Sequence, residues 1–144
     1  MLFRSYSYGF TLVELMITIA ILGLLSSIAI PYYSDIARKT YEARTKANLG
    51  TIRSALSIYF GDTEGMTPLD DLTSLKSKYL TDIPVKYTPP FHPEGNDVSA
   101  GDDTAMATAK GDWFYFNVPA SANFGKVVVN CVHTDLREAV WSSY

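Results

Sequence analysis

Residues 9–31 read GFTLVELMITIAILGLLSSIAIP, and this stretch decides the fold. It holds a single ionisable side chain, Glu14, and the sixteen residues that follow, 15–30, carry no charge. A carboxylate in an apolar membrane-type segment costs about 2.5 kcal/mol or more at the bilayer centre, so it is a functional-site hypothesis by default. Glu14 therefore needs a partner, and identifying that partner gives the function.

The apolar run is long enough to cross a membrane. Residues 10–31 make 22 residues, which as a helix cover a hydrocarbon core of roughly 30 Å. Pro31, Tyr32 and Tyr33 follow the run and do not form the small-residue cleavage site of a secretory signal, so we expect the run to stay in the mature protein. Arg4 precedes it and favours a cytoplasmic N-terminus.

Composition limits what the rest of the chain does. The 144 residues suffice for one ordinary domain. The net charge of −3, from 12 basic and 15 acidic residues, argues against nucleic acid as the main partner. The single cysteine, Cys131, has no intrachain disulfide partner, and we interpret it as a small buried hydrophobic residue.

The segment Gly9-Phe10-Thr11-Leu12-Val13-Glu14, followed by the apolar run and Pro31, resembles the class III signal of type IV pilins and type II secretion pseudopilins. This resemblance implies that a prepilin peptidase cuts between Gly9 and Phe10 and methylates the new amino terminus. Phe10 then becomes N-methylphenylalanine, and Glu14 becomes the fifth residue of the mature chain. Members of the family often carry several basic residues in the leader, whereas this leader has only Arg4.

The resemblance also implies a partner for Glu14. Cleavage creates a positively charged amine at Phe10, and packing of subunits in a filament buries it. An unpaired buried charge is very costly, whereas a paired one is tolerated. We therefore expect Glu14 of one subunit to pair with the Phe10 amine of a neighbour. The alternative is a carboxylate near the membrane interface, solvated by lipid headgroups.

Pro31 marks the end of the apolar run. Proline inside a helix removes a hydrogen bond and tends to kink the helix. The resemblance implies a kink or a locally melted stretch between Gly23 and Pro31. The alternative is a plain helix end at Pro31, followed by a second helix.

The remaining sequence predicts an α+β pilin fold, with a long N-terminal helix packed on a C-terminal antiparallel sheet of about three strands. Helical periodicity continues to Phe60, with an apolar face that we expect to pack on the chain's own sheet. We expect three divisions of the chain: leader 1–9, transmembrane or filament-core helix 10–31, and globular domain 32–144.

Local patterns predict the smaller elements of the globular domain. They are a short helix over 68–80, a loop over 84–110, and an antiparallel meander of strands over 113–118, 126–132 and 138–144.

The sequence shows few candidates for a catalytic or metal-binding site. His92 and His133 show no spacing like a zinc site, and we interpret both as solvated loop residues. We expect no enzyme, metal or cofactor. Acidic residues gather near one loop, where calcium is the alternative to an ordinary solvated loop. They are Asp97, Asp102, Asp103 and Asp112.

The resulting hypothesis is a structural subunit of a type IV pilus or type II secretion pseudopilus. Its expected partners are copies of itself or homologous pilins, the prepilin peptidase, an inner-membrane assembly platform, and lipid before assembly. We expect a single-pass bacterial inner-membrane protein that becomes a periplasmic or cell-surface filament. The alternative is a bitopic membrane protein that presents a small extracytoplasmic binding domain.

Overall fold

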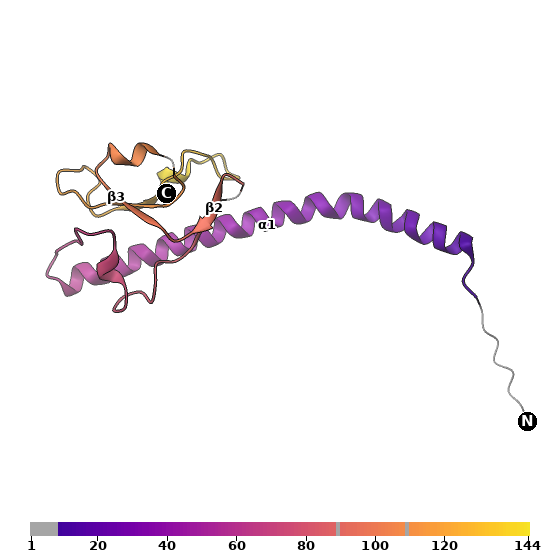
Figure 1. The fold of residues 1–144 in the computed structure, drawn as a ribbon, viewed down its shortest axis with the longest axis horizontal. Helices are drawn as coiled ribbons and strands as arrows, with labels where there is room; N and C mark the ends of the chain where they lie inside the picture. The colour runs from indigo at the N-terminus through magenta and orange to yellow at the C-terminus, as the bar shows by residue number, and fades with distance from the viewer. Residues whose placement is uncertain (1–8, 89, 109) are drawn as a thin grey trace, which may run out of the picture. The chain divides into compact units, whose positions relative to one another are not determined.

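The computed structural model describes residues 9–88, 90–108 and 110–144. The chain forms two compact units, Met1–Ala37 and Arg38–Tyr144. The elements follow one another as shown in Figure 1. They are α1 (Leu12–Asp62), η1 (Thr73–Leu75), β1 (Lys86–Thr88), β2 (His92–Gly95), β3 (Val98–Gly101), η2 (Ala105–Thr108), β4 (Trp113–Phe116), β5 (Val127–Val129) and η3 (Trp141–Ser143).

Helix α1 confirms the predicted long N-terminal helix and is 51 residues long. It continues without a break through Pro31. Neither a melted stretch between Gly23 and Pro31 nor a helix end at Pro31 therefore occurs in the isolated chain, and a kink at Pro31 stays a prediction. Ser34 Oγ donates to the Pro31 carbonyl at 2.8 Å. The hydroxyl group thus bonds to a backbone acceptor in the preceding turn of the helix.

Two hydroxyl groups inside the apolar part of α1 bond to the backbone of the helix itself. Thr18 Oγ1 donates to the Leu15 carbonyl, and Ser27 Oγ donates to the Leu24 carbonyl, each at 2.8 Å. Such bonds to the preceding turn leave the outer surface of the helix apolar.

Five strands form two sheets in the described part of the chain. β1 and β2 make an antiparallel pair, and the other sheet has the order β3-β4-β5. β4 and β5 are antiparallel, with Trp113 opposite Val129, whereas β3 runs parallel to β4, with Val98 opposite Trp113. The α+β class is confirmed, and the expected purely antiparallel sheet is corrected to a mixed one.

Three predictions of local structure are wrong. Residues 84–110 are not simply a loop, because they contain β1, β2, β3 and η2. Pro93 and Gly95 lie within β2 and Gly101 ends β3, because a very short strand tolerates a missing donor.

The predicted strand over 138–144 is instead η3, with one isolated bridge between Thr134 and Val140. The backbone amides of Trp141 and Ser142 donate to the carbonyls of His133 and Cys131, each at 3.1 Å. These bonds to a nearby loop replace a strand ladder.

The predicted helix over 68–80 is reduced to η1. Asp70 accepts hydrogen bonds from the backbone amides of Leu72 and Ser74, which is a local alternative to helix. Leu72 has φ 69° and Ser77 has φ 71°, and a right-handed helix does not continue through left-handed residues.

The core lies between the second half of α1 and the β3-β4-β5 sheet. β4 is buried at all four positions because it is covered on both faces. One face packs with α1 in a cluster that includes Leu49, Ile52, Leu56, Trp113, Tyr115, Val127, Val129 and Trp141. The other face holds Phe114, Phe116 and Val128. The expectation that the apolar helix face packs on the chain's own sheet is confirmed.

Candidate assembly site

The first half of α1 presents an apolar surface that no described part of the chain covers. Leu12 is 74% exposed, Leu24 71% and Ile28 73%. By length and composition, α1 is able to cross a membrane. A soluble chain does not leave a continuous apolar surface of this kind in water, so the surface needs lipid or another apolar helix.

Glu14 lies in the first turn of this helix and caps it. Thr11 is the residue before the helix, and its carbonyl accepts the first helical bond from Leu15 N at 3.2 Å. Thr11 Oγ1 accepts from Glu14 N at 3.2 Å. In return, Glu14 Oε2 accepts from Thr11 N at 2.8 Å and from Thr11 Oγ1 at 2.7 Å. This reciprocal arrangement is a capping box.

The capping box gives Glu14 a partner inside its own chain, which our reasoning from the sequence missed. The Thr-x-x-Glu signature was present at residues 11–14 and was sufficient to find it. Thr11 is neutral, so the cap does not balance the carboxylate's charge. Both hydrogen bonds from Thr11 end on Oε2, so the cap makes no use of the other oxygen.

Gly9 and Phe10 precede α1 in non-helical backbone, and both are exposed. The predicted cleavage bond between them is therefore not locked in the helix. Thr11 and Glu14 lie on the mature side of that bond, so the capping box needs no residue of the leader. Arg4 and the rest of leader residues 1–8 lie outside the described residues.

The globular unit holds a very different carboxylate, Asp135, whose side chain is fully buried. Lys46 Nζ lies 2.5 Å from Asp135 Oδ2, and the Tyr144 hydroxyl donates to the same oxygen at 2.6 Å. Oδ1 accepts from the amides of Arg137 and Ala139 at 2.8 and 3.0 Å. Burial alone would raise the pKa of Asp135, but these hydrogen bonds outweigh it and hold the pKa well below its usual range.

Glu42 is a second buried carboxylate of the globular unit. Its oxygens accept from the Leu136 amide at 3.2 and 3.1 Å, and Arg38 Nε lies 3.3 Å away. Together with Lys46 and Asp135, it ties α1 to the loop after β5.

Three of the four loop aspartates have separate hydrogen-bond partners. Asp112 is buried and accepts from Asn130 Nδ2 at 2.8 Å, and it also bonds to Ser99. Asp102 accepts from Thr104, whereas Asp103 accepts from Asn123 at 2.6 Å. Each of these three carboxylates thus holds a different turn or strand.

The expectation for the histidines is corrected. His92 begins β2, and both His92 and His133 are half-buried rather than solvated. Cys131 is 1% exposed, which confirms its predicted burial. His92, Cys131 and His133 each offer one potential ligand atom, and these atoms lie within 4.8 Å of one another. None of the four aspartates belongs to this group.

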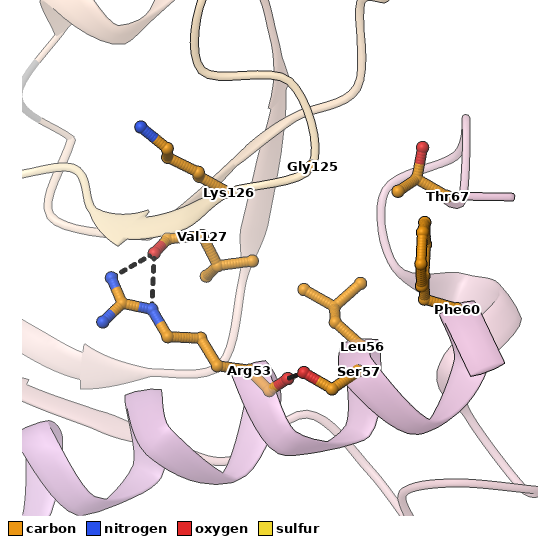
Figure 2. A pocket seen from close by; sticks show the side chains of 8 residues that line it. All are labelled: Arg53, Leu56, Ser57, Phe60, Thr67, Gly125, Lys126 and Val127. Carbon is orange, nitrogen blue, oxygen red and sulfur yellow. Dashed lines mark hydrogen bonds between the residues drawn. The ribbon is translucent and has the colours of Figure 1, made fainter. Parts of the chain in front are cut away.

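An apolar cavity of about 390 Å³ lies in the globular unit between α1 and β5 (Figure 2). Arg53 at its edge donates to the Val127 carbonyl at 2.8 Å through Nη2 and to the Tyr144 carbonyl at 2.6 Å. Its guanidinium thus fastens the helix to β5 and to Tyr144, the residue after η3. The cavity is lined by Arg53, Leu56, Ser57, Phe60, Thr67, Gly125, Lys126 and Val127.

The N-terminal part of the chain, which contains the start of α1, matches a known family of sequence motifs. The family model of the prokaryotic N-terminal methylation motif matches residues 4–30. The recognition of this signal is therefore confirmed.

The relatives are pilins. The chain is 33% identical over 87 residues to the fimbrial protein EcpC of Eikenella corrodens, which covers 57% of this chain and 56% of that protein. It is 41% identical over 70 residues to the type IV major alpha-pilin of Moraxella bovis, covering 49% and 43% of the two chains. The type IV major fimbrial protein FimA of Dichelobacter nodosus is 42% identical over 53 residues, covering 37% and 34%. The match thus spans about half or less of each relative, and no solved structure matches the chain.

Proposed function

We propose that this protein is a structural, non-enzymatic subunit of a type IV pilus or type II secretion pseudopilus. The observation that carries the proposal is the exposed apolar half of α1, which bears one carboxylate whose charge is unbalanced among the described residues. The methylation motif and the pilin relatives support the same function.

The apolar surface requires two successive environments. Burying one large apolar side chain is worth about 1.5–3 kcal/mol, so the helix partitions into the inner membrane when the chain is made. Leaving the membrane is favourable only if other apolar helices take the place of lipid. Copies of this chain or homologous pilins supply such helices in a filament, which reaches the periplasm or the cell surface. An inner-membrane assembly platform carries the subunit from one environment to the other.

The charge on Glu14 sets the register of that packing. The prepilin peptidase cuts after Gly9 and creates a cationic amine at Phe10, and N-methylation leaves it a cation. Only a stagger that brings this amine to a neighbour's Glu14 avoids two uncompensated buried charges. The capping box holds the carboxylate in place through Oε2, so the side chain is oriented before the neighbour arrives.

Mass spectrometry of filaments sheared from cells tests the proposal. We expect the processed protein in the filament fraction, beginning at Phe10 with a methylated amine. The second candidate, a bitopic anchored protein, is favoured by the same exposed helix. A chain that keeps its uncleaved leader and stays in the membrane fraction would support that candidate and contradict ours.

A further inference from the structure

Three side chains of types that can bind metal ions come from distant parts of the chain and meet in the globular unit. His92 begins β2, whereas Cys131 and His133 follow β5. Their potential ligand atoms lie within 4.8 Å of one another, and Cys131 Sγ lies 3.3 Å from His133 Nδ1. The filament function makes no use of this cluster.

We propose that His92, Cys131 and His133 form a binding site for a divalent transition metal of the zinc type. Thiolate and imidazole are the ligands that zinc prefers. Zinc–sulfur and zinc–nitrogen bonds of about 2.3 and 2.0–2.1 Å place sulfur and nitrogen about 3.6 Å apart in a tetrahedral site. The 3.3 Å separation of Sγ and Nδ1 is close to that value, so small side-chain movements complete the site.

His92 supplies an independent indication of a ligand. Its Nε2 is buried and has no hydrogen-bond partner among the described residues. Most buried polar atoms have a partner, because an unsatisfied one costs about 1–3 kcal/mol. Coordination of a metal through this nitrogen removes the deficit.

The backbone at Gly111 packs closely against the side chain of His92. Gly111 has φ 71°, and a Cβ on it would lie 2.2 Å from His92 Cγ. Both facts require glycine at this position. Gly111 N donates to the Asn130 carbonyl at 2.8 Å, which fixes this turn beside Cys131. The imidazole thus rests against backbone rather than against a flexible side chain.

The other histidine is fixed by stacking. The rings of Phe91 and His133 lie parallel, with centroids 4.1 Å apart and an interplanar angle of 6°. The rings of His92 and His133 meet edge to face at 5.2 Å. A preset arrangement of ligands lowers the cost of ordering them around a metal.

Cys131 is the sulfur ligand of the group, and zinc binds cysteine as the thiolate. A bound metal therefore displaces the thiol proton. It would join β2 to the segment after β5 and leave a fourth position for water or another ligand.

Cobalt(II) titration of the full-length protein in detergent micelles tests the site. Cobalt replaces zinc, and a thiolate ligand produces a charge-transfer absorption that imidazoles do not. We expect one equivalent to bind with this absorption, and zinc to displace it. Absence of the band in the wild-type protein would overturn the proposal without any variant.

Variants assign the ligands. Cys131→Ser should abolish the band and the binding, and His92→Gln and His133→Gln should each weaken binding by more than about tenfold. Val132→Ala is the matched control, because Val132 lies between two ligands and is 61% exposed. Zinc should raise the melting temperature of the wild type and of Val132→Ala, but not of Cys131→Ser. Equal cobalt affinity in a folded Cys131→Ser protein would contradict the site.

Discussion

The carboxylate in the apolar half of α1 and the buried carboxylate Asp135 of the globular unit have opposite surroundings. Asp135 is fully buried and has Lys46, Tyr144 and two backbone amides as partners. Glu14 stands on an exposed apolar surface and has only the neutral Thr11. A charge balanced within the chain stabilises the fold. In our proposal, a charge left unbalanced on an apolar surface pairs with an opposite charge on a second subunit. Four predictions separate these roles.

The largest expected effect is the loss of filaments in Glu14→Ala. This change removes the charge that sets the register, so the Phe10 amine of the neighbouring subunit is buried without a partner. We expect a protein that is processed and present in the membrane, with no filaments in sheared fractions. Val13→Ala is the control, because Val13, like Glu14, is exposed but carries no charge. Normal filament yield from Glu14→Ala would remove the contrast between the two carboxylates.

Asp135→Asn should act on the fold instead. It leaves Lys46 without its anion. Because the Lys46 side chain is 29% exposed, we expect a loss below the value of about 3–5 kcal/mol for a fully buried pair. Both tryptophans of the chain, Trp113 and Trp141, lie in the globular core, so their fluorescence during denaturation in micelles reports this unit alone. Asp62→Asn is the control, because the Asp62–Lys78 pair is exposed, and solvent-exposed ion pairs contribute little to stability. Equal stability of the two variants would contradict the structural role.

Acid should weaken the globular unit through the same residue. The pKa of Asp135 is lower in the folded chain than in the unfolded chain, so the unfolded chain binds the proton more readily. Its stabilisation is therefore complete above the unfolded pKa of about 3.9 and declines as the pH falls below that value. The free energy of unfolding, measured between pH 5 and pH 3, should fall less steeply in Asp135→Asn. Identical slopes would show that another group carries the dependence.

The smallest effect is expected from Thr11→Ala. Loss of the cap costs about 1 kcal/mol at the first turn of α1 and leaves the charge of Glu14 intact. Hydrogen exchange in micelles should show faster exchange in the first turn only, and filaments should persist. Thr18→Ala is the control, because the Thr18 hydroxyl bonds within the helix and caps nothing. Unchanged exchange in Thr11→Ala would mean that the capping box does not form.

The sequence predicts the parts of this molecule that depend on local pattern. The apolar run and its continuing periodicity are sufficient to place α1, whose observed bounds are Leu12–Asp62. The aromatic run at β4 and the valines of β5 likewise mark two strands. Residues 138–144 carry the same kind of apolar pattern and still form no strand, because their amides bond to the loop at Cys131 and His133.

Sites whose residues lie far apart in the sequence cannot be predicted from local sequence patterns. Lys46 and Asp135 are 89 residues apart in the sequence. In the sequence, the strands β3, β4 and β5 lie between His92 and Cys131. Their spacing along the chain carries no signal, and only the fold brings them together. The capping box of Thr11 and Glu14 is the opposite case, because its two residues are three positions apart and form a recognisable sequence signature.

Filament yield from Glu14→Gln beside Thr11→Ala tests the role of Glu14 most directly. Glutamine keeps the size of the side chain and is accepted in a capping box, so Glu14→Gln removes the charge and keeps the cap. Thr11→Ala removes the cap and keeps the charge. We predict processed protein without filaments for Glu14→Gln and near-normal filaments for Thr11→Ala. Wild-type yield from Glu14→Gln, with failure of Thr11→Ala, would show that Glu14 serves its own helix rather than a neighbour.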